Sequence, residues 1–328
     1  MKKILGMGNA LTDILLQIDN DNILSELALP KGSMQLIDEA KAVEISDFLR
    51  HIQPKMATGG SASNTINGIT KLGNEAGFFG KIGTDTVGDF FLKNSVENGV
   101  TPHLQYSQIP SGRCTVLVSK DGERTLCTFL GAACELESKD LSTEIFNGYD
   151  IFHIEGYLVQ NHDLIRNAVR MAKNEGLKVS IDLASYNVVE GNLDFLKEIV
   201  SEYVDIVFAN EEEAKAFTGE EPEKALNTIA NMCEIAVVKV GKDGSYIQSG
   251  NEIIRISPRK ANCIDTTGAG DLYAAGFLFG LANNFSYDIC GEIGSLVSGK
   301  VVEVLGAKMS AEVWNDIYNE IESITSKN

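Results

Sequence analysis

The stretch Asp265-Thr266-Thr267-Gly268-Ala269-Gly270-Asp271 carries the strongest structural signal in this chain. Apolar residues with helical spacing follow it directly, between Leu272 and Leu281, so it predicts a glycine-rich turn that opens a buried helix. Glycine lets backbone N–H groups approach a ligand, and the first N–H groups of a helix are unpaired and lie at the positive end of its dipole. The Gly268-Ala269-Gly270 backbone is therefore a candidate anion-binding cradle.

Asp271, directly after this cradle, has two interpretations. An acidic residue in the first turn of a helix commonly serves as a cap or complements the helix dipole. A carboxylate also repels phosphate, so one placed beside an anion cradle is suited to take a proton from an attacking hydroxyl group. The heptapeptide alone leaves both interpretations open.

The composition favours a large globular protein with an acidic surface. The chain has 328 residues, 44% of them hydrophobic, and a net charge of -18. This charge argues against nucleic acid or an anionic membrane as a partner. There is no signal-peptide pattern and no apolar run of membrane-spanning length, so we expect a cytoplasmic protein. The cysteines form no CxxC pair and are expected to be reduced thiols; they are Cys114, Cys127, Cys134, Cys233, Cys263 and Cys290.

Residues 3–8 predict a first strand, and two polar residues follow it. Gly6-x-Gly8 resembles the start of a dinucleotide fingerprint, but Leu11 stands where the third glycine is needed. Asn9 and Asp13 have turn-forming side chains, which is the simpler interpretation. The alternative is that Asp13 accepts hydrogen bonds from ligand hydroxyl groups.

A second glycine-rich stretch is Thr58-Gly59-Gly60-Ser61-Ala62-Ser63-Asn64. Its double glycine precedes a helix of small side chains, and Asn64 is expected one turn into that helix. The stretch is either a place where the backbone approaches a ligand or a close packing site between helix and strand. Further helices are expected from Asp38 to about Arg50 and over 85–98, with a strand over 76–82.

A β-hairpin interrupts this strand–helix pattern. The alternating runs 114–119 and 124–129 flank Lys120-Asp121-Gly122-Glu123, which contains the Asp-Gly hairpin signal. We expect this hairpin to form a small β-sheet lid together with strands near 14–18 and 33–37. The expected organisation is a single domain, 1–328, with lid segments at about 12–37 and 103–131.

The alternation of strands and helices returns after residue 150 and predicts an α/β fold. Its core is a doubly wound, mostly parallel sheet with helices on both faces. Strands are expected at 151–155, 178–182, 205–209 and 235–240, and helices at about 162–175, 193–202, 211–218, 222–233 and 286–304. Ligands of such sheets bind beyond the carboxyl ends of the strands. The polar and glycine residues expected there are Asp182, Asn210, Glu213, Lys239, Gly241 and Gly244.

Two motifs after residue 150 have both a structural and a functional interpretation. Asn210 and Glu213 are either a helix cap with dipole-favoured acids or residues that orient Mg²⁺ through water. Residues 294–300 fit the glycine and lysine spacing of a P-loop, but Val301 stands where Ser or Thr is needed and no strand precedes them. We interpret that match as chance.

Taken together, these motifs resemble the ribokinase-like (PfkB) family of ATP-dependent sugar and nucleoside kinases. The stretch 265–271 is similar to the second family signature and 59–64 to the first. Asn210-x-x-Glu213 looks like the magnesium and phosphate motif, and Gly241-x-x-Gly244 lies where the family contacts the nucleotide. The order and spacing match over essentially the whole chain.

The resemblance implies a role for each matching residue. Asp271 would be the general base, and Gly268, Ala269 and Gly270 would stabilise the transferring phosphoryl group. The acceptor hydroxyl groups would be held by Asn9, Asp13, Gly59, Gly60 and Asn64. ATP and Mg²⁺ would be held by Asn210, Glu213 (Mg²⁺ through water), Lys239, Gly241, Gly244 and Ser295. Ribokinases have an Asn at about the position of Ser295. Asp265 and Thr267 match the region where some members bind a monovalent cation such as K⁺.

Within the family, Gly8-Asn9-Ala10-Leu11-Thr12-Asp13 and Lys31-Gly32-Ser33-Met34 look most like the adenosine-kinase-like branch. The acceptor implied there is the 5′-hydroxyl group of a nucleoside. Phe129 and Tyr157 are the candidates for stacking on a base. A free-sugar kinase of the ribose or fructose type and a non-catalytic nucleotide or metabolite sensor are the alternatives, and Asp271 argues against the sensor. Both a monomer and a homodimer remain open.

Overall fold

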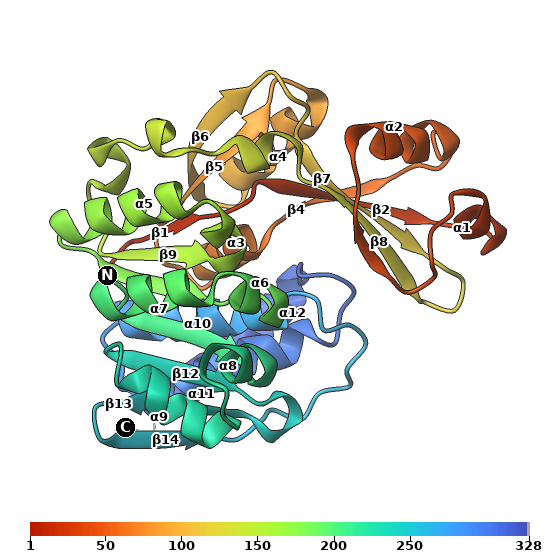
Figure 1. Cartoon of the computed structure of the whole chain (residues 1–328). Helices are drawn as coiled ribbons and strands as arrows, with labels where there is room; N and C mark the ends of the chain where they lie inside the picture. The colour runs from red at the N-terminus through yellow and green to blue at the C-terminus, as the bar shows by residue number, and fades with distance from the viewer. Residues whose placement is uncertain (327–328) are drawn as a thin grey trace.

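A computed structural model describes residues 1–326 of the chain. It contains a nine-stranded sheet in the order β14-β13-β12-β11-β10-β9-β1-β5-β6 and a separate five-stranded sheet in the order β3-β8-β7-β2-β4 (Figure 1). The strands of the large sheet are β1 (Ile4–Met7), β5 (Ala76–Gly83), β6 (Val100–Ser107), β9 (Ile151–Glu155), β10 (Lys178–Asp182), β11 (Ile206–Asn210), β12 (Ile235–Lys239), β13 (Ser245–Ser249) and β14 (Glu252–Ile256). The small sheet contains β2 (Leu11–Gln17), β3 (Met34–Leu36), β4 (Lys55–Gly59), β7 (Gly112–Val118) and β8 (Arg124–Phe129).

The large sheet is parallel from β6 to β12, which confirms the predicted doubly wound α/β fold. Strands β13 and β14 extend it as an antiparallel hairpin that the sequence analysis did not predict. Strand order reverses between β1 and β9, because β5 lies on one side of β1 and β9 on the other. In sheets of this kind a ligand crevice opens at that point, outside the carboxyl ends of the strands.

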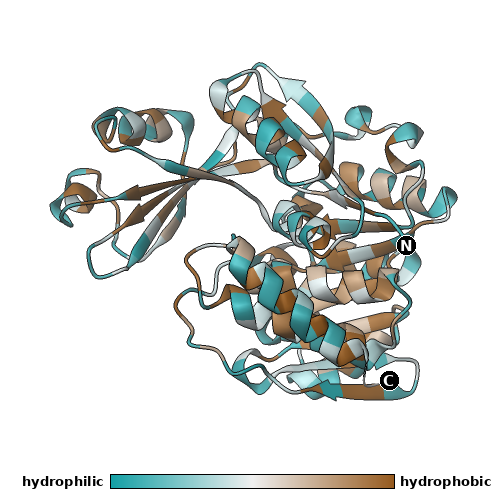
Figure 2. Ribbon diagram, turned by 180° about the vertical axis from the view of Figure 1, so that it is seen from behind, coloured by the Kyte–Doolittle hydropathy of each residue, from teal (hydrophilic) through white to brown (hydrophobic). Residues whose placement is uncertain are grey.

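Successive strand residues point to opposite faces and divide the core in two. Ile206 and Phe208 pack on one side of β11, and Val207 and Ala209 pack on the other. The first side is covered by α3 (Ser61–Lys71), α4 (Thr86–Glu97), α10 (Ala269–Ala282), α11 (Tyr287–Val301) and α12 (Ala311–Thr325). The second is covered by α5 (His162–Asn174), α6 (Tyr186–Gly191), α7 (Leu193–Glu202), α8 (Glu211–Thr218) and α9 (Pro222–Ala230). Figure 2 shows hydrophobic residues concentrated in the sheet and hydrophilic ones on the outer helix surfaces.

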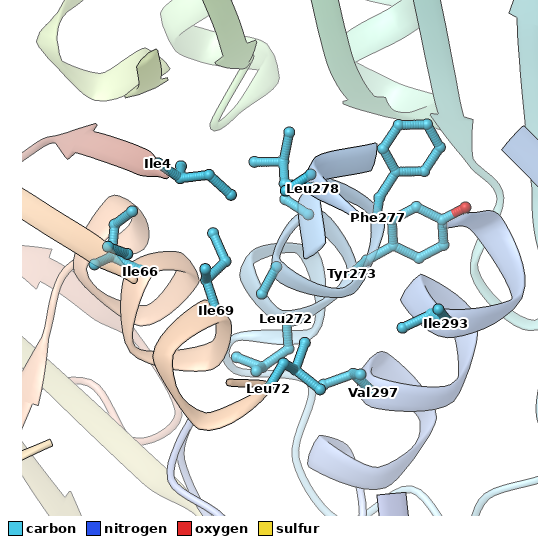
Figure 3. Close-up of a cluster of buried hydrophobic side chains, with 14 of the residues drawn as sticks. Ile4, Ile66, Ile69, Leu72, Leu272, Tyr273, Phe277, Leu278, Ile293 and Val297 are labelled. Atoms are coloured by element: carbon cyan, nitrogen blue, oxygen red, sulfur yellow. The ribbon is translucent and has the colours of Figure 1, made fainter. Parts of the chain in front are cut away.

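Helix α10 packs between α3 and α11 (Figure 3). Glycines allow these helices to approach closely: a Cβ on Gly68 would lie 2.7 Å from the Ala275 Cβ, and one on Gly276 would lie 2.8 Å from the Gly294 Cα. Around these contacts Ile69, Leu272 and Val297 fill the core. This packing fixes the first turn of α10 against the first turn of α3, which places the two glycine-rich stretches next to each other.

The small sheet is built around the predicted hairpin, in which β7 and β8 pair in antiparallel fashion and Gly122 adopts a positive φ of 88°. One of its faces packs on α1 (Asn22–Glu26) and α2 (Glu39–Phe48) through a separate apolar cluster. Its composition differs from the expected segments in two places. Strand β4 joins its edge, although Lys55–Gly59 lies in neither segment, and β6, which overlaps the start of 103–131, belongs to the large sheet.

Several local predictions are confirmed by the helix ends. Asp38 and Asp85 are N-caps, and their carboxylates accept hydrogen bonds from the Lys41 and Gly88 N–H groups at 2.8 Å. The glycine and lysine spacing at 294–300 lies inside α11 and forms no phosphate-binding loop. Within residues 1–326, no helix combines the length and the apolar character needed to span a membrane.

Candidate active site

A cleft of about 1940 Å³ lies between the carboxyl edge of the large sheet and the inner face of the small sheet. Four neighbouring strands of the large sheet end in polar residues that line it: Glu155, Asp182, Asn210 and Lys239. The first turns of α3 and α10 also line the cleft. The tertiary structure therefore brings both glycine-rich stretches and the strand-end residues to one cavity.

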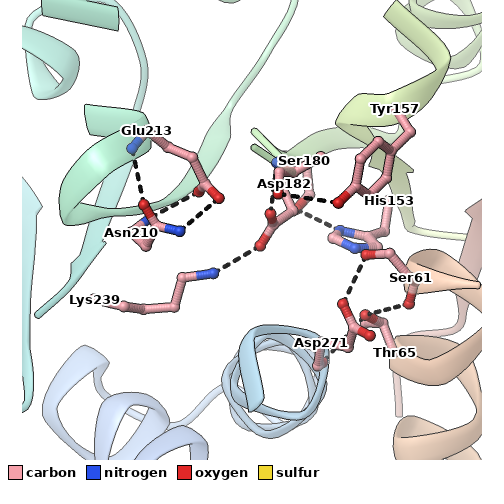
Figure 4. Close-up of polar contacts among 11 residues, drawn as sticks. Ser61, Thr65, His153, Tyr157, Ser180, Asp182, Asn210, Glu213, Lys239 and Asp271 are labelled. Atoms are coloured by element: carbon pink, nitrogen blue, oxygen red, sulfur yellow. Dashed lines mark hydrogen bonds and ion pairs between the residues drawn. The ribbon is translucent and has the colours of Figure 1, made fainter. Parts of the chain in front are cut away.

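The Asp271 carboxylate is bonded to α3 rather than to its own helix. Its Oδ1 accepts a hydrogen bond from the Ser61 hydroxyl at 2.7 Å (Figure 4). Its Oδ2 accepts one from Asn64 Nδ2 at 3.0 Å. Gly268 occupies the N-cap position of α10, and no side chain caps this helix. Asp271 is therefore not the cap of α10, although it lies in the first turn, where an acid complements the helix dipole. Burial raises its pKa to about 6, against the lowering effect of the Ser61 and Asn64 hydrogen bonds.

The start of α10 offers free backbone donors. In the described part of the chain, no partner is found for the N–H groups of Gly268, Gly270 and Asp271, whereas the Ala269 N–H donates to the Thr266 carbonyl at 3.1 Å. Gly268 has a positive φ of 78°, which favours glycine. Of the predicted cradle Gly268-Ala269-Gly270, the N–H groups of Gly268 and Gly270 are thus candidate anion donors, that of Ala269 is already paired, and the Asp271 N–H is a further candidate.

A lysine lies beside this turn. A Cβ built on Gly270 would be 3.1 Å from Lys239 Nζ, so the ammonium group borders the free N–H groups. Lys239 Nζ is held at 2.8 Å by Asp182 Oδ2 (Figure 4). Although burial lowers the pKa of Lys239, Asp182 and Glu213 raise it above its usual range, which keeps the ammonium group charged. Positive charge and unpaired donors therefore converge at one point of the cleft.

Asn210 and Glu213 form a reciprocal helix cap. The Glu213 N–H donates to Asn210 Oδ1 at 2.8 Å, and the Asn210 N–H donates back to Glu213 Oε2 at 2.8 Å. The predicted helix cap is thus present. Glu213 also lines the cleft, so the magnesium interpretation stays open. Burial, with the neighbouring Asp182, raises the pKa of Glu213 to about 7.

The acceptor-side residues predicted from the first signature lie around Asp13. This residue is inside β2, so its interpretation as a turn former is wrong. A Cβ on Gly59 would lie 2.4 Å from Asp13 Oδ1, and one on Gly60 would lie 2.2 Å from the Asn9 carbonyl oxygen. The two glycines therefore allow close packing of the backbone, as one of the two interpretations predicted, and this packing lies at the wall of the cleft. Burial raises the pKa of Asp13 to about 6, while Lys308 and Arg124 lower it.

Asp265 is engaged entirely by protein donors in the described contacts. Its carboxylate accepts from the Thr267 N–H at 3.0 Å, the Thr267 hydroxyl at 2.7 Å and the Gly306 N–H at 2.7 Å. It also forms an ion pair with Arg124, which reaches it from β8 of the small sheet. A monovalent cation bound directly to this carboxylate does not fit while Arg124 holds it.

The match to known proteins decides the family. Residues 33–314 match the pfkB family of carbohydrate kinases. The chain belongs to this family. Its large parallel sheet with a second small sheet is the ribokinase-like fold, and it is a phosphotransferase with an alcohol group as acceptor. ATP as phosphoryl donor follows from the family.

Relatives place the chain in the adenosine-kinase-like branch of PfkB kinases. The crystal structure of adenosine kinase from Sinorhizobium meliloti is 33% identical, with a TM-score of 0.85 over 97% of this chain and 99% of that one. A probable sugar kinase from Rhizobium etli is 31% identical, with the same TM-score over 97% and 98%. Adenosine kinase from Dictyostelium discoideum is 27% identical over 94% of this chain and 97% of its own.

Three residues in or next to the cleft of this PfkB kinase escaped the sequence analysis: Glu155 lines it, whereas Arg124 and Lys308 contact residues of the site. Glu155 accepts hydrogen bonds from the Asn9 and Ala62 N–H groups at 2.9 and 3.0 Å, which ties β1 to α3. Arg124 and Lys308 reach the site from distant segments. The only local signal was their charge in an acidic chain, because nothing in the neighbouring sequence indicates where they point. Burial raises the pKa of Glu155 to about 7, although its hydrogen bonds lower it.

The remaining predicted residues divide between lining the cleft and packing elsewhere. Gly241, Gly244, Ser295 and Tyr157 line the cleft. The Ser295 hydroxyl donates to the Ser257 carbonyl at 3.1 Å. Phe129 is not among the lining residues; it is buried, with the Arg113 guanidinium over its ring. The prediction that Phe129 stacks on a base is therefore wrong, and Tyr157 remains.

Proposed function

We propose that this PfkB kinase transfers the γ-phosphoryl group of ATP to a primary hydroxyl group of a nucleoside, with Asp271 as general base. One observation carries the proposal. The Asp271 carboxylate faces the cleft at the start of α10, held by Ser61 and Asn64, directly beside the free N–H groups of Gly270 and Asp271. A base and an anion site in contact are what phosphoryl transfer to an alcohol requires.

The protonation state of Asp271 supports this role. With a pKa of about 6, the carboxylate is largely deprotonated at neutral pH and is a stronger base than an ordinary aspartate. The two hydrogen bonds from α3 fix its orientation. Its remaining lone pairs are available to the hydroxyl group of an acceptor in the cleft.

The transferring phosphoryl group would lie at the start of α10. The unpaired Gly270 and Asp271 N–H groups and the helix dipole stabilise negative charge there. Lys239, held by Asp182, adds a fixed positive charge beside Gly270. Such preorganised groups supply most of the catalysis in phosphoryl transfer, since little covalent chemistry is needed.

The nucleotide would occupy the part of the cleft lined by Gly241, Gly244 and Ser295. Asp182, Asn210 and Glu213 would hold Mg²⁺ there. Their oxygen donors suit this ion, and the Glu213 oxygens already accept bonds from Asn210, which favours contact through water. When bound, Mg²⁺ would neutralise phosphate charge, and the chain's own residues would orient the phosphates towards α10.

The acceptor would lie between Asp13 and the small sheet. Its hydroxyl groups would bond to Asp13 and Asn64 beside the Gly59 and Gly60 backbone. Apolar side chains extend from there along the cleft wall: Leu11, Met34, Leu36, Leu126 and Tyr157. Met34 and Leu36 are 61% and 68% exposed, so they leave apolar area for a flat base. The adenosine kinase relatives support this choice.

A free-sugar acceptor is the second candidate. Glu155, Asp13 and Asn64 make the inner end of the cleft strongly polar, and the relative from Rhizobium etli is a probable sugar kinase. A small sugar would use this inner end and leave the apolar wall empty. In either case we propose that residues 1–328 act as a single unit in which the small sheet is a lid over the acceptor.

Acceptor screening tests the proposal. ADP release with Mg·ATP is measured for adenosine, inosine, guanosine, ribose and fructose, with Asp271→Asn as the control. Strong release with a nucleoside, lost in the variant, is the expected result. Release with a free sugar would replace the acceptor and keep the mechanism. Binding of ATP without release for any acceptor would favour a sensor and contradict the proposed function.

A further inference from the structure

Lys308, which lies outside both signatures, brings a positive charge to Asn64, a residue that lines the cleft. It lies between α11 and α12, and its ammonium group donates to Asn64 Oδ1 at 3.1 Å. The same Asn64 donates through Nδ2 to Asp271 Oδ2 at 3.0 Å. The three residues therefore form a chain of contacts, from Lys308 through Asn64 to Asp271.

The chemistry of the Lys308 ammonium group fixes the orientation of the Asn64 amide between Lys308 and Asp271. Lysine only donates hydrogen bonds, whereas the two ends of an asparagine amide differ, one accepting and one donating. With the carbonyl facing Lys308, the NH₂ group must face the Asp271 carboxylate. The reversed amide would set NH₂ against an ammonium group and a carbonyl against a carboxylate, and both contacts are repulsive.

We infer that Lys308 is a positioning residue for phosphoryl transfer. It orients the Asn64 amide, so that Asn64 holds one oxygen of Asp271 and leaves the carboxylate aimed at the acceptor. It also balances the negative charge of Asp13 and Asp271 on this side of the cleft. The inference rests on the proposed role of Asp271 as the base.

The charges around both groups shape the pH dependence. Asp13 and Asp271 face Lys308 and favour its charged form. Burial outweighs their effect and, together with Lys71 of α3, lowers the pKa of Lys308 to about 8. Around Asp271, Asp182 raises the pKa of the carboxyl group and Lys239 lowers it. The buried Glu155 also interacts with Asp271. These groups belong to other elements and stay in place when only Lys308 is changed.

Lys308→Met is the main test, because it keeps most of the side-chain length and removes both charge and donor. We expect kcat to fall by roughly 10- to 100-fold, the effect of misplacing a reacting group. The acidic limb of the kcat profile should move to higher pH, because Asp271 loses a neighbouring positive charge. Lys308→Arg should restore kcat. It should also remove any loss of activity above about pH 8, since a guanidinium stays charged there.

Controls separate positioning from general structural damage. Lys93→Met removes an exposed lysine from α4, outside the cleft lining and away from the charges around Lys308, and should leave both kcat and the pH profile unchanged. Lys308→Gln provides a second variant if the methionine variant unfolds. It keeps a donor for Asn64 without the charge, so it should recover part of kcat while the acidic limb stays shifted.

The outcomes distinguish this inference from the proposed function. Wild-type kinetics in folded Lys308→Met, or a loss of kcat with an unmoved pH profile in both neutral variants, would overturn the positioning role. If Asp271→Asn is inactive at the same time, the general-base proposal survives that result. If Asp271→Asn keeps normal turnover, both proposals are overturned.

Discussion

The Ser61 hydroxyl donates to Asp271 Oδ1 at 2.7 Å, although the two residues are 210 positions apart in the chain. This contact joins the first turn of α3 to the first turn of α10. It shows why the two glycine-rich stretches belong to one site: the first positions the carboxylate that the second provides. The side chain that looked like a helix cap is thereby directed into the cleft.

Asp271→Asn should reduce turnover by about 10²–10⁴-fold, the usual contribution of a positioned general base. Asparagine has nearly the same shape but cannot take the proton. The affinity for ATP should change little, because the backbone donors of α10 remain. Steady-state ADP release measures the turnover, and calorimetry measures the affinity for ATP separately. Near-normal turnover in a folded variant would remove Asp271 from the catalytic role.

The activity should depend on pH through Asp271. Its pKa of about 6 lies above the ordinary value of 3.8, so the active, deprotonated base is lost as the pH falls through about 6. We expect kcat/KM for the acceptor to rise up to about pH 6–7 and then to level off. The profile is measured between pH 4.5 and 8.5, with circular dichroism to confirm folding. Constant kcat/KM down to pH 4.5 would contradict the assignment.

Asp13→Ala should weaken the binding of the acceptor and leave the binding of the nucleotide unchanged. Lost hydrogen bonds to a charged acceptor group cost roughly 1.5–3 kcal/mol, which corresponds to about a 10- to 100-fold higher acceptor KM. The KM for ATP should remain close to that of the wild type. Asp47→Ala, on an exposed position of α2, is the matched control. An unchanged acceptor KM would leave Asp13 with only a structural role in β2.

Arg124 should make the kinase insensitive to the choice of monovalent cation. Its guanidinium pairs with Asp265, the carboxylate that such a cation would otherwise need. Replacing K⁺ by choline at constant ionic strength should therefore change kcat little in the wild type. In Arg124→Met the freed carboxylate should make activity respond to K⁺. Strong K⁺ activation of the wild type would contradict this prediction.

Phosphoryl transfer should greatly exceed wasteful ATP hydrolysis. The small sheet lines the acceptor side of the cleft, and in its proposed role as a lid it would exclude water from the phosphoryl group. ADP formation is compared with and without a saturating acceptor, and inorganic phosphate release is measured in parallel. Equal rates with and without acceptor would exclude the lid role of the small sheet.

The sequence alone predicted features whose causes are local. Strands β9 and β10 and helices α7 and α8 begin and end at the predicted residues, because hydrophobic periodicity and nearby polar residues set such boundaries. Asp38 and Asp85 were recognised as helix starts because a cap bonds to an N–H group only three residues away. The motif at 265–271 led to the correct family for a related reason: a turn that exposes N–H groups needs glycine at particular consecutive positions.

The tertiary structure decided which distant residues share the site. Strand β4 joined the small sheet through pairing with β2, and its short sequence has no alternation that predicts a strand. The contacts of Arg124 with Asp265, of Glu155 with Asn9 and of Lys308 with Asn64 depend on how the sheets and helices pack. Backbone conformation depends on residues a few positions away. The convergence of side chains depends on strand order and helix packing, which bring together residues that are 141 to 244 positions apart in these three pairs.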